Sequence, residues 1–244
     1  MKIYILLPAL FLSFSALRGQ VFIEVGPMPN AREAFSSVII YGSDGLAKTI
    51  PYDQVKGSPF WQGSWRKAYF FDRRDTALGS YRAKFNFVSQ EVHYITKNGE
   101  EQVVIPDELN RVVFMREDDS TKIAAIFRYN IEEVRKRTAC KNCFVQELNQ
   151  GHTKLLKITQ RQLKTADSLF GTLKTYFFFD AEEYFVQTGD QYNRIKRLNK
   201  TSFFSFIPGA SLYNAWIREK GLRFNKESEY LVFLEHYNAT YKKD

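Results

Sequence analysis

The chain has 244 residues and a formal net charge of +8 at pH 7, with 44% hydrophobic and 25% charged residues. This balance is typical of a globular protein and excludes a wholly disordered chain, a collagen-like repeat and a multi-span membrane protein. The length suits one large domain or two small ones. Aromatic residues make up 16% of the chain, which favours β-strands and a well-filled core.

The first nineteen residues have the pattern of a secretory signal peptide. Lys2 precedes an apolar stretch, residues 3–17, that is interrupted by Pro8 and is too short to span a bilayer as a helix. Small and polar residues follow, and Gly19 before Gln20 is the expected cleavage site. The sequence therefore predicts export, and an uncleaved N-terminal anchor is the alternative.

The first half of the mature chain reads as a series of strands. An extended segment at 21–30 leads to a strand at 36–40 and a turn at 41–45. Alternating apolar and polar residues predict a strand over 81–87, and Asn98-Gly99 predicts a hairpin between 91–96 and 102–105. Two further strands are expected at 111–115 and 123–129, with a turn at 117–120 between them.

The second half adds hairpins and ends in helices. A hairpin is expected from strands 144–148 and 152–159, and two separate strands at 174–179 and 182–188, with Asp180 and Glu182 flanking the turn between them. The tail predicts a short helix over 201–206. A second helix would have Ser211 as its N-cap and Gly221 as its stop, and a third would have Asn225 as its N-cap.

Strands followed by helices predict an α+β fold, an antiparallel β-sheet built from hairpins with two or three helices at the C-terminal end. We expect a signal peptide over 1–19, an antiparallel β half over 20–135, and a second β half with the C-terminal helices over 136–244. No low-complexity linker divides the chain, so the two halves could form one compact domain.

Most of the net positive charge lies in one segment. Residues 128–164 carry 9 basic and 3 acidic side chains. A concentrated positive charge attracts anionic partners, and the alternative is a solvated face that aids solubility. The candidate anionic-contact face consists of Arg135, Lys136, Arg137, Lys141, Lys154 and Lys157. No basic run alternates with aromatic residues as a single-strand binder requires, so nucleic acid is not an expected partner.

The two cysteines, Cys140 and Cys143, lie in the same basic segment. In an exported protein a pair at this spacing favours a small local disulfide. A thiol-redox site would need a helix N-terminus after the first cysteine, whereas the alternating residues 144–148 indicate a strand. A zinc site would need two further ligands, and the three histidines are scattered singly. We expect no metal and no cofactor.

Phe60, Trp61 and Trp65 form the candidate aromatic patch, which could bind a carbohydrate or a protein partner or could close the core. The acidic groups at 117–119 and 180–183 are expected in solvated turns. His93 is expected on the polar face of its strand. The chain has no Gly-x-Ser-x-Gly, phosphate-binding or His-Glu-x-x-His motif, so we predict no catalytic residues, although triads can assemble from distant segments.

Several features together resemble a group of exported proteins of Bacteroidota-type bacteria. They are the segment Gly57-Ser58-Pro59-Phe60-Trp61 with Trp65, the Asn-Gly hairpin, and the spacing of Phe144, Leu148, Gly151 and Leu155 to Lys157. The aromatic helical tail ending in Tyr237-Asn238 completes the likeness. The resemblance covers nearly the whole mature chain and implies a periplasmic or cell-surface location. It carries no known activity and no catalytic residues.

We therefore expect a non-catalytic binding or structural component of the bacterial envelope. Its partner would be an anionic envelope lipid or glycan, or another envelope protein, reached through the basic face. A thiol-redox protein using Cys140 and Cys143 and a carbohydrate-binding module using Trp61 and Trp65 are the alternatives.

Overall fold

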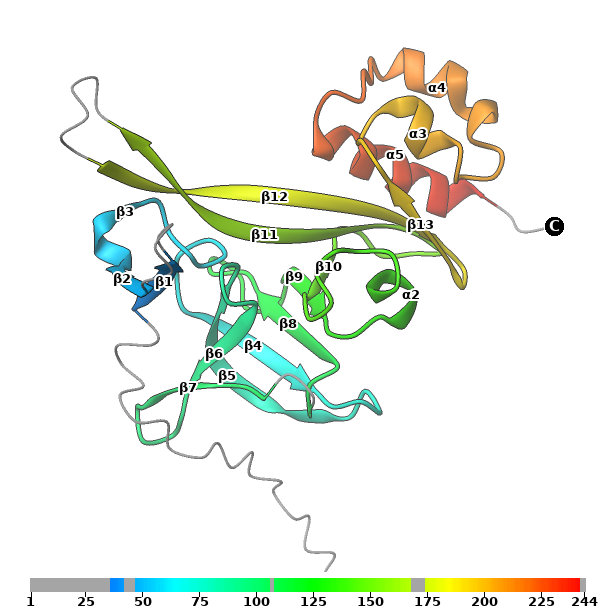
Figure 1. Cartoon of the computed structure of the whole chain (residues 1–244). Helices are drawn as coiled ribbons and strands as arrows, with labels where there is room; N and C mark the ends of the chain where they lie inside the picture. Colours follow the sequence, from blue (N-terminus) through cyan, green and yellow to red (C-terminus); the bar gives the residue numbers. More distant parts are fainter. Residues whose placement is uncertain (1–35, 42–46, 106–107, 168–173, 242–244) are drawn as a thin grey trace, which may run out of the picture.

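The computed structural model of the chain describes residues 36–41, 47–105, 108–167 and 174–241. The predicted signal peptide, the segment 21–30 and most of the predicted turn at 41–45 lie outside the described residues. A curled sheet, a long two-stranded arm and a cluster of short C-terminal helices make up the fold (Figure 1).

The predicted α+β fold with mostly antiparallel strands is confirmed. Among the described residues a two-stranded sheet contains β1 (Ser37–Tyr41) and β2 (Ala47–Pro51). The other strands form an eleven-stranded sheet, in which β3 runs parallel to β12. These strands are β3 (Val55–Lys56), β4 (Arg66–Phe71), β5 (Ala77–Asn86), β6 (Glu91–Ile95), β7 (Glu101–Val103), β8 (Arg111–Met115), β9 (Ile123–Arg128), β10 (Val145–Glu147), β11 (Thr153–Asp167), β12 (Lys174–Thr188) and β13 (Gln191–Ile195).

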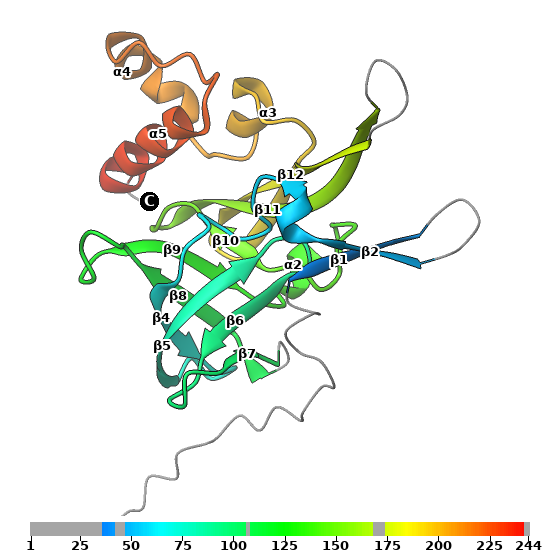
Figure 2. The ribbon, with the colours of Figure 1, turned by 90° about the vertical axis from the view of Figure 1, so that its left-hand side faces the viewer.

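The large sheet curls back on itself. Its strand order is β13-β12-β11-β10-β9-β8-β4-β5-β6-β7, yet the backbone N–H of Arg161 in β11 donates to the carbonyl of Phe87, just after β5, at 3.0 Å. The curl encloses an aromatic core that includes Phe70, Phe85 and Phe127. Figure 2 shows β4, β5, β6, β8 and β9 together in the curled part of the sheet, below β11 and β12.

The predicted hairpins of the first half are confirmed because their alternating pattern matches the burial. In β5, Ala83 and Phe85 are buried and Arg82 is exposed. Strands β6 and β7 pair around the turn that contains Asn98-Gly99. Strands β8 and β9 pair around the predicted turn at 117–120. A strand in a sheet with one packed face buries every second side chain, and this produces the alternation of apolar and polar residues.

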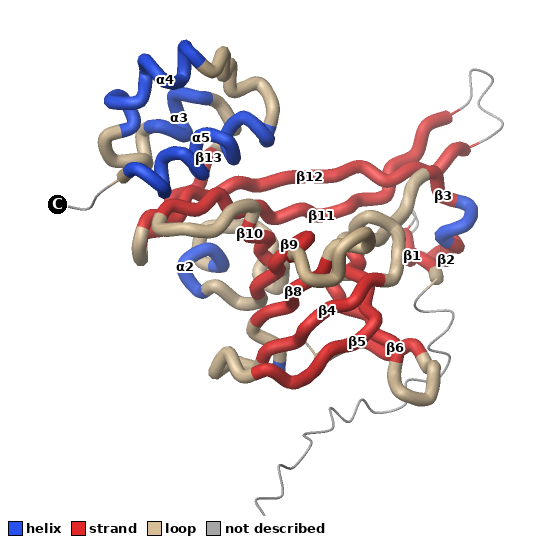
Figure 3. The backbone as a smooth tube through the Cα atoms, turned by 180° about the vertical axis from the view of Figure 1, so that it is seen from behind, coloured by secondary structure: helices blue, strands red, loops and turns tan. Residues whose placement is uncertain are grey.

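The arm formed by β11 and β12 is covered on both faces near its base. Leu155 and Val186 face the C-terminal helices, whereas Leu156 and Phe185 face the short helix α2 (Glu132–Arg135) and Cys143. Successive side chains of a strand point to opposite faces, so the two cores are separated by the thickness of the sheet. Figure 3 shows the helical cluster and α2 on opposite sides of this arm.

The C-terminal residues form a helical cluster with an aromatic core. It contains α3 (Lys200–Phe204), a 3-10 helix (Ala210–Tyr213), α4 (Asn214–Glu219) and α5 (Glu227–Thr240). Phe203, Phe233 and Tyr237 are fully buried in it. None of the helices in the described part of the chain has the length and apolar composition needed to cross a bilayer.

The prediction of two strands at 174–179 and 182–188 is wrong, because β12 is continuous through this region. Asp180 lies within the strand opposite Arg161 of β11. The guanidinium of Arg161 binds the Asp180 carboxylate through two hydrogen bonds of 2.6 and 2.7 Å. A bidentate ion pair of this kind compensates the negative charge of a carboxylate inside a strand. The acidic residues therefore do not interrupt the sheet.

The predicted N-caps of the last two helices are also wrong. Gly209, in the left-handed region at φ 66°, precedes the 3-10 helix, so Ser211 lies inside it. The N-cap of α5 is Lys226 and not Asn225. The Glu229 carboxylate accepts hydrogen bonds from the backbone N–H groups of Arg223, Asn225 and Lys226. Glu229, the third residue of the helix, thus reaches back to the N–H of the N-cap residue, as the acidic residue of a capping box does, and to two N–H groups before it.

Asn238 of α5 attaches the helical cluster to the turn between β10 and β11. Its side chain accepts a hydrogen bond from the Thr153 N–H at 2.9 Å and donates to the carbonyls of Thr153 and Gln150. This close approach requires glycine at position 151, where φ is +122° and an added Cβ would lie 2.5 Å from Asn238 Nδ2.

We predict that Gly151→Ala lowers the free energy of unfolding by about 2–4 kcal/mol, because it adds backbone strain and a clash with Asn238. Urea unfolding followed by circular dichroism measures the change. Gly221→Ala is the matched control, since its φ is +63° and an added Cβ there meets no atom within 4 Å. Equal losses in the two variants would contradict the contact with Asn238.

Candidate functional site

The cysteine pair closes a short loop after α2. The sulfur atoms of Cys140 and Cys143 lie at disulfide distance, as predicted, and their Cα atoms are 5.5 Å apart. Cys143 is buried against Val134 and Leu156, whereas Cys140 is half-buried. Strand β10 begins at Val145, two residues after Cys143, so the loop is joined directly to the sheet.

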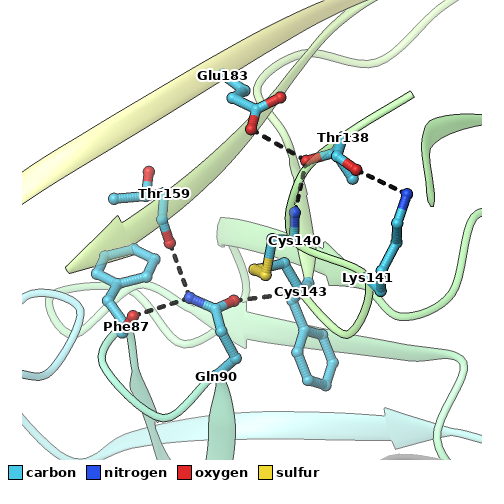
Figure 4. Close-up of a disulfide and its surroundings, with 9 residues drawn as sticks. Phe87, Gln90, Thr138, Cys140, Lys141, Cys143, Thr159 and Glu183 are labelled. Atoms are coloured by element: carbon cyan, nitrogen blue, oxygen red, sulfur yellow. Dashed lines mark hydrogen bonds between the residues drawn. A yellow bond between two sulfur atoms is a disulfide. The ribbon is translucent and has the colours of Figure 1, made fainter. Parts of the chain in front are cut away.

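Thr138 and Lys141 fix the backbone of this loop (Figure 4). The Thr138 hydroxyl donates to Glu183 of β12 at 3.1 Å and accepts from the Cys140 N–H at 3.2 Å. The Lys141 ammonium donates to the carbonyls of Arg135 and Thr138 at 3.0 and 2.9 Å. Together with the cysteine pair, these contacts hold residues 132–143 in one conformation on the sheet.

Gln90 connects this loop to the curled sheet. Its amide nitrogen donates to the carbonyls of Phe87 and Thr159 at 2.9 and 2.8 Å, and its amide oxygen accepts from the Phe144 N–H at 3.2 Å. Gln90 is buried and has a positive φ of 58°. Sequence reasoning missed Gln90, because no motif marks a glutamine that bonds to the backbone of distant segments.

Four of the six predicted basic contact residues lie on or beside α2 and are exposed: Arg135, Lys136, Arg137 and Lys141. Lys136 forms an ion pair with Glu132 at 2.7 Å. Arg137 donates to the backbone carbonyl of Tyr192, and Lys141 donates to carbonyls as described above. Since a carbonyl carries no net charge, Arg137 and Lys141 keep their positive charge at the surface. We name residues 132–141 the basic loop.

The other two predicted contact residues are half-buried and lie apart from the basic loop. Lys154 forms an ion pair with the buried Glu147 at 3.2 Å. Lys157 projects from the opposite face of β11 and pairs with Glu182 and Glu227 at 3.0 and 2.8 Å. Both cations are compensated by carboxylates within the fold, so the six residues do not form one contact face.

Lys157 belongs to a polar cluster between β12 and the start of α5. The Tyr184 hydroxyl donates to Glu182 and Glu227, each at 2.8 Å. Burial and these two carboxylates raise the pKa of Tyr184 far above its usual value. Burial lowers the pKa of Lys157, but its hydrogen bonds to Glu227 and Glu182 outweigh that effect and raise it. The cluster thus keeps both groups protonated and joins the helices to the sheet.

The predicted aromatic patch is divided between two sides of the sheet. Trp61 is buried in the aromatic core, with ring centroids 5.3 Å from Phe114 and 5.6 Å from Phe127. Phe60 and Trp65 lie on the other side and contact Lys84, whose ammonium is 4.1 and 4.3 Å from their ring centroids. Trp61 therefore closes the core, and Phe60 and Trp65 bind a cation of the chain itself.

The prediction that His93 lies at the surface is wrong, because its side chain is fully buried. Its Nδ1 is 2.7 Å from the Glu101 carboxylate, and Glu101 also pairs with Lys84 at 2.9 Å. The Phe60 ring stacks edge-on against His93 at 5.5 Å. The loop that carries Phe60 thus covers the polar face of β6, which the alternating pattern alone assigns to solvent.

The pKa of the Glu101 carboxyl is shifted by its surroundings. Burial raises the pKa of Glu101, but the hydrogen bonds from His93 and Lys84 outweigh burial and lower it below the usual 4.5. Carboxylate, imidazole and ammonium groups in contact are a combination found in active sites. Here Phe60 and Trp65 pack on Lys84, Phe60 also packs on His93, and the arrangement holds the loop on the sheet.

Comparisons with family models, with curated proteins and with solved structures found no match to this chain. The described residues contain no group of three or more His, Cys, Asp or Glu side chains placed to hold a metal ion. The function must therefore be argued from the surface and the charges of this chain alone.

We predict that breaking the cysteine pair costs about 2 kcal/mol of unfolding free energy, the loop-closure value for a ring of roughly four residues. Urea unfolding of the double variant Cys140→Ala, Cys143→Ala measures it. Wild-type protein in excess reductant is the control and should match the variant. Identical unfolding of the oxidised and reduced wild type would contradict a stabilising disulfide.

The lowered pKa of Glu101 predicts an acid-dependent loss of stability. Because the folded state favours the ionised carboxylate, its contribution is complete above the usual value of 4.5 and disappears as the pH falls below it. The stability difference between wild type and Glu101→Gln should therefore shrink from pH 7 to acid pH in thermal unfolding. Glu100→Gln, at an exposed neighbour, is the control. A difference that stays constant with pH would exclude this contribution.

Proposed function

We propose that this protein is an exported, non-catalytic component of the bacterial envelope that binds an anionic lipid surface through the basic loop, residues 132–141. The observation that carries the proposal is the exposure of Arg135, Lys136, Arg137 and Lys141 on one loop that is held by the cysteine pair. Binding through such a loop loses little conformational entropy, because the backbone is already fixed.

The charge distribution supports this assignment. Among the predicted contact residues, Lys154 and Lys157 are paired with carboxylates of the sheet and of α5, and Lys136 is paired with Glu132 of the basic loop itself. Arg137 and Lys141 contact carbonyls. Glu132 and Glu133 in the first turn of α2 reduce the charge of the loop, so its attraction for an anionic surface is moderate. A moderate attraction of exposed charges is screened strongly by salt.

The N-terminal pattern and the cysteine pair support the proposed location. A charged n-region followed by a short apolar stretch is the pattern of an export signal. Disulfides persist in compartments that oxidise thiols, such as the bacterial periplasm. The resemblance to exported proteins of Bacteroidota-type bacteria agrees with both features. These observations favour a periplasmic or cell-surface location over the cytosol.

Vesicle binding tests the proposed function. We expect the protein to co-sediment with vesicles of phosphatidylglycerol and phosphatidylcholine, and less so with pure phosphatidylcholine. The triple variant Arg135→Gln, Lys136→Gln, Arg137→Gln should bind roughly 100-fold more weakly, since each cation near an anionic surface contributes ~1 kcal/mol. Raising the salt concentration should weaken wild-type binding.

The matched control is Arg74→Gln, Arg82→Gln, Lys97→Gln, which removes the same charge from other exposed positions. Equal loss in both triple variants would mean that net charge, and not the basic loop, determines binding. Retention on a sulfated or carboxylated glycan without vesicle binding would assign the loop to a glycan. Wild-type binding that is insensitive to salt would remove the electrostatic basis of the proposal.

A further inference from the structure

A surface depression lies at one end of the aromatic core, where β4 begins and β8 turns into β9. It has a volume of about 700 Å³ and is lined by Gln62, Arg66, Arg116, Glu117, Asp118 and Ile123, with Ala124 beside them. This volume falls within the range of small-molecule sites, which often form at the open ends of curled sheets. None of these residues belongs to the basic loop.

Arg66 lines the depression and is held in place by two neighbours. Its guanidinium stacks over the Trp61 ring at 5.5 Å, and its Nη2 pairs with Glu117 at 3.2 Å. Glu117 also accepts from the Ser64 hydroxyl at 3.4 Å. The side chain of Arg66 is only 12% exposed, and its buried Nε has no hydrogen-bond acceptor among the described residues. A buried donor without an acceptor is unusual in proteins and marks a position where a polar partner is expected.

The rim of the depression carries planar polar groups and one apolar surface. Arg116 binds Asp118 through two hydrogen bonds of 2.9 and 2.6 Å, and both side chains are about half exposed or more. Gln62 has a positive φ of 50°, a strained conformation for a residue with a side chain. Ile123 is 46% exposed. The depression therefore offers donors, acceptors and an apolar contact within one surface.

The charges of the lining determine which ligand fits. Arg66 and Arg116 supply two positive charges, and Glu117 and Asp118 supply two negative charges, so the formal net charge is zero. With a net charge of zero, the lining gives neither an anion nor a cation a net attraction that would offset the loss of its hydration. A neutral molecule with adjacent hydroxyl groups can accept from a guanidinium and donate to a carboxylate at the same time. Its C–H groups would contact Ile123.

We propose that this depression is a binding site for a neutral oligosaccharide. Arg66 and Glu117 bind one pair of hydroxyl groups, Arg116 and Asp118 bind another at the rim, and Ile123 contacts the apolar face of a sugar ring. The site lies beside Trp61 but does not use its ring face, which the core and Arg66 cover. The proposal is independent of membrane binding by the basic loop.

Nuclear magnetic resonance titration of the ¹⁵N-labelled protein tests the site. The probes are the neutral trisaccharides maltotriose, cellotriose, mannotriose and triacetylchitotriose, with trigalacturonate as an anionic probe of the same size. We expect at least one neutral probe to shift the amide signals of residues 62–66 and 116–124 saturably. Trigalacturonate should bind more weakly, because the lining gives its carboxylates no net attraction to offset the loss of their hydration.

Arg116→Gln and Asp118→Asn are the test variants, because both residues are exposed and their loss leaves the core intact. Each should weaken binding about tenfold, the effect of one charge-assisted hydrogen bond. Arg74→Gln, at an exposed position outside the depression, should leave the dissociation constant unchanged, and none of these single variants should abolish vesicle binding. The proposal is overturned if no neutral trisaccharide binds, if trigalacturonate binds more tightly, or if the test variants bind as wild type does.

Discussion

The side chain of Gln90 joins three backbone segments that are far apart in the chain. Its amide bonds to Phe87 at the end of β5, to Thr159 in β11 and to Phe144 at the start of β10. Buried carbonyl and N–H groups must be paired, and one backbone hydrogen bond, from Arg161 to Phe87, already joins β11 to the end of β5 here. The Gln90 amide adds partners for Thr159 and Phe144, so this side chain and the backbone bond together close the curl of the sheet. The three hydrogen bonds of Gln90 offset the strain of a positive φ.

This junction sets the position of the functional surfaces. Phe144 directly follows Cys143, so the hydrogen bond from the Phe144 N–H to Gln90 fixes the chain just after the basic loop relative to the curled sheet. On the other side, the same curl places Trp61 inside the core with Arg66 stacked over it. The proposed lipid-binding loop and the proposed saccharide site thus occupy separate parts of one framework.

The hairpins of this protein could be predicted from its sequence because their side-chain pattern is local. Alternation in 81–87 and the Asn98-Gly99 turn determine burial and pairing within a few residues. The continuity of β12 could not be predicted, since Asp180 is compensated by Arg161, nineteen residues earlier. The burial of His93 likewise depends on Phe60, which belongs to a different loop. Local patterns do not encode contacts of this kind.

The candidate contact face was predicted only in part for the same reason. Charge counting along the chain treats Arg135 and Lys157 alike, yet Arg135 is exposed and Lys157 is paired with Glu227, seventy residues away. The proposed saccharide site could not be predicted from the sequence, because its residues come from two loops and from two strands. Arg116, Glu117 and Asp118 are consecutive in the chain and have the pattern of a solvated turn. Only the fold brings Gln62 and Arg66 beside them.

Hydrogen exchange of wild type and Gln90→Met tests the central claim most directly. Methionine has a similar shape and removes all three hydrogen bonds, which leaves buried backbone groups unpaired. If Gln90 closes the curl, amide exchange will accelerate together in residues 85–91, 143–147 and 156–161, while α5 stays protected. Faster exchange confined to the turn at 88–91 would show that the sheet holds its curl without this side chain and would contradict the account.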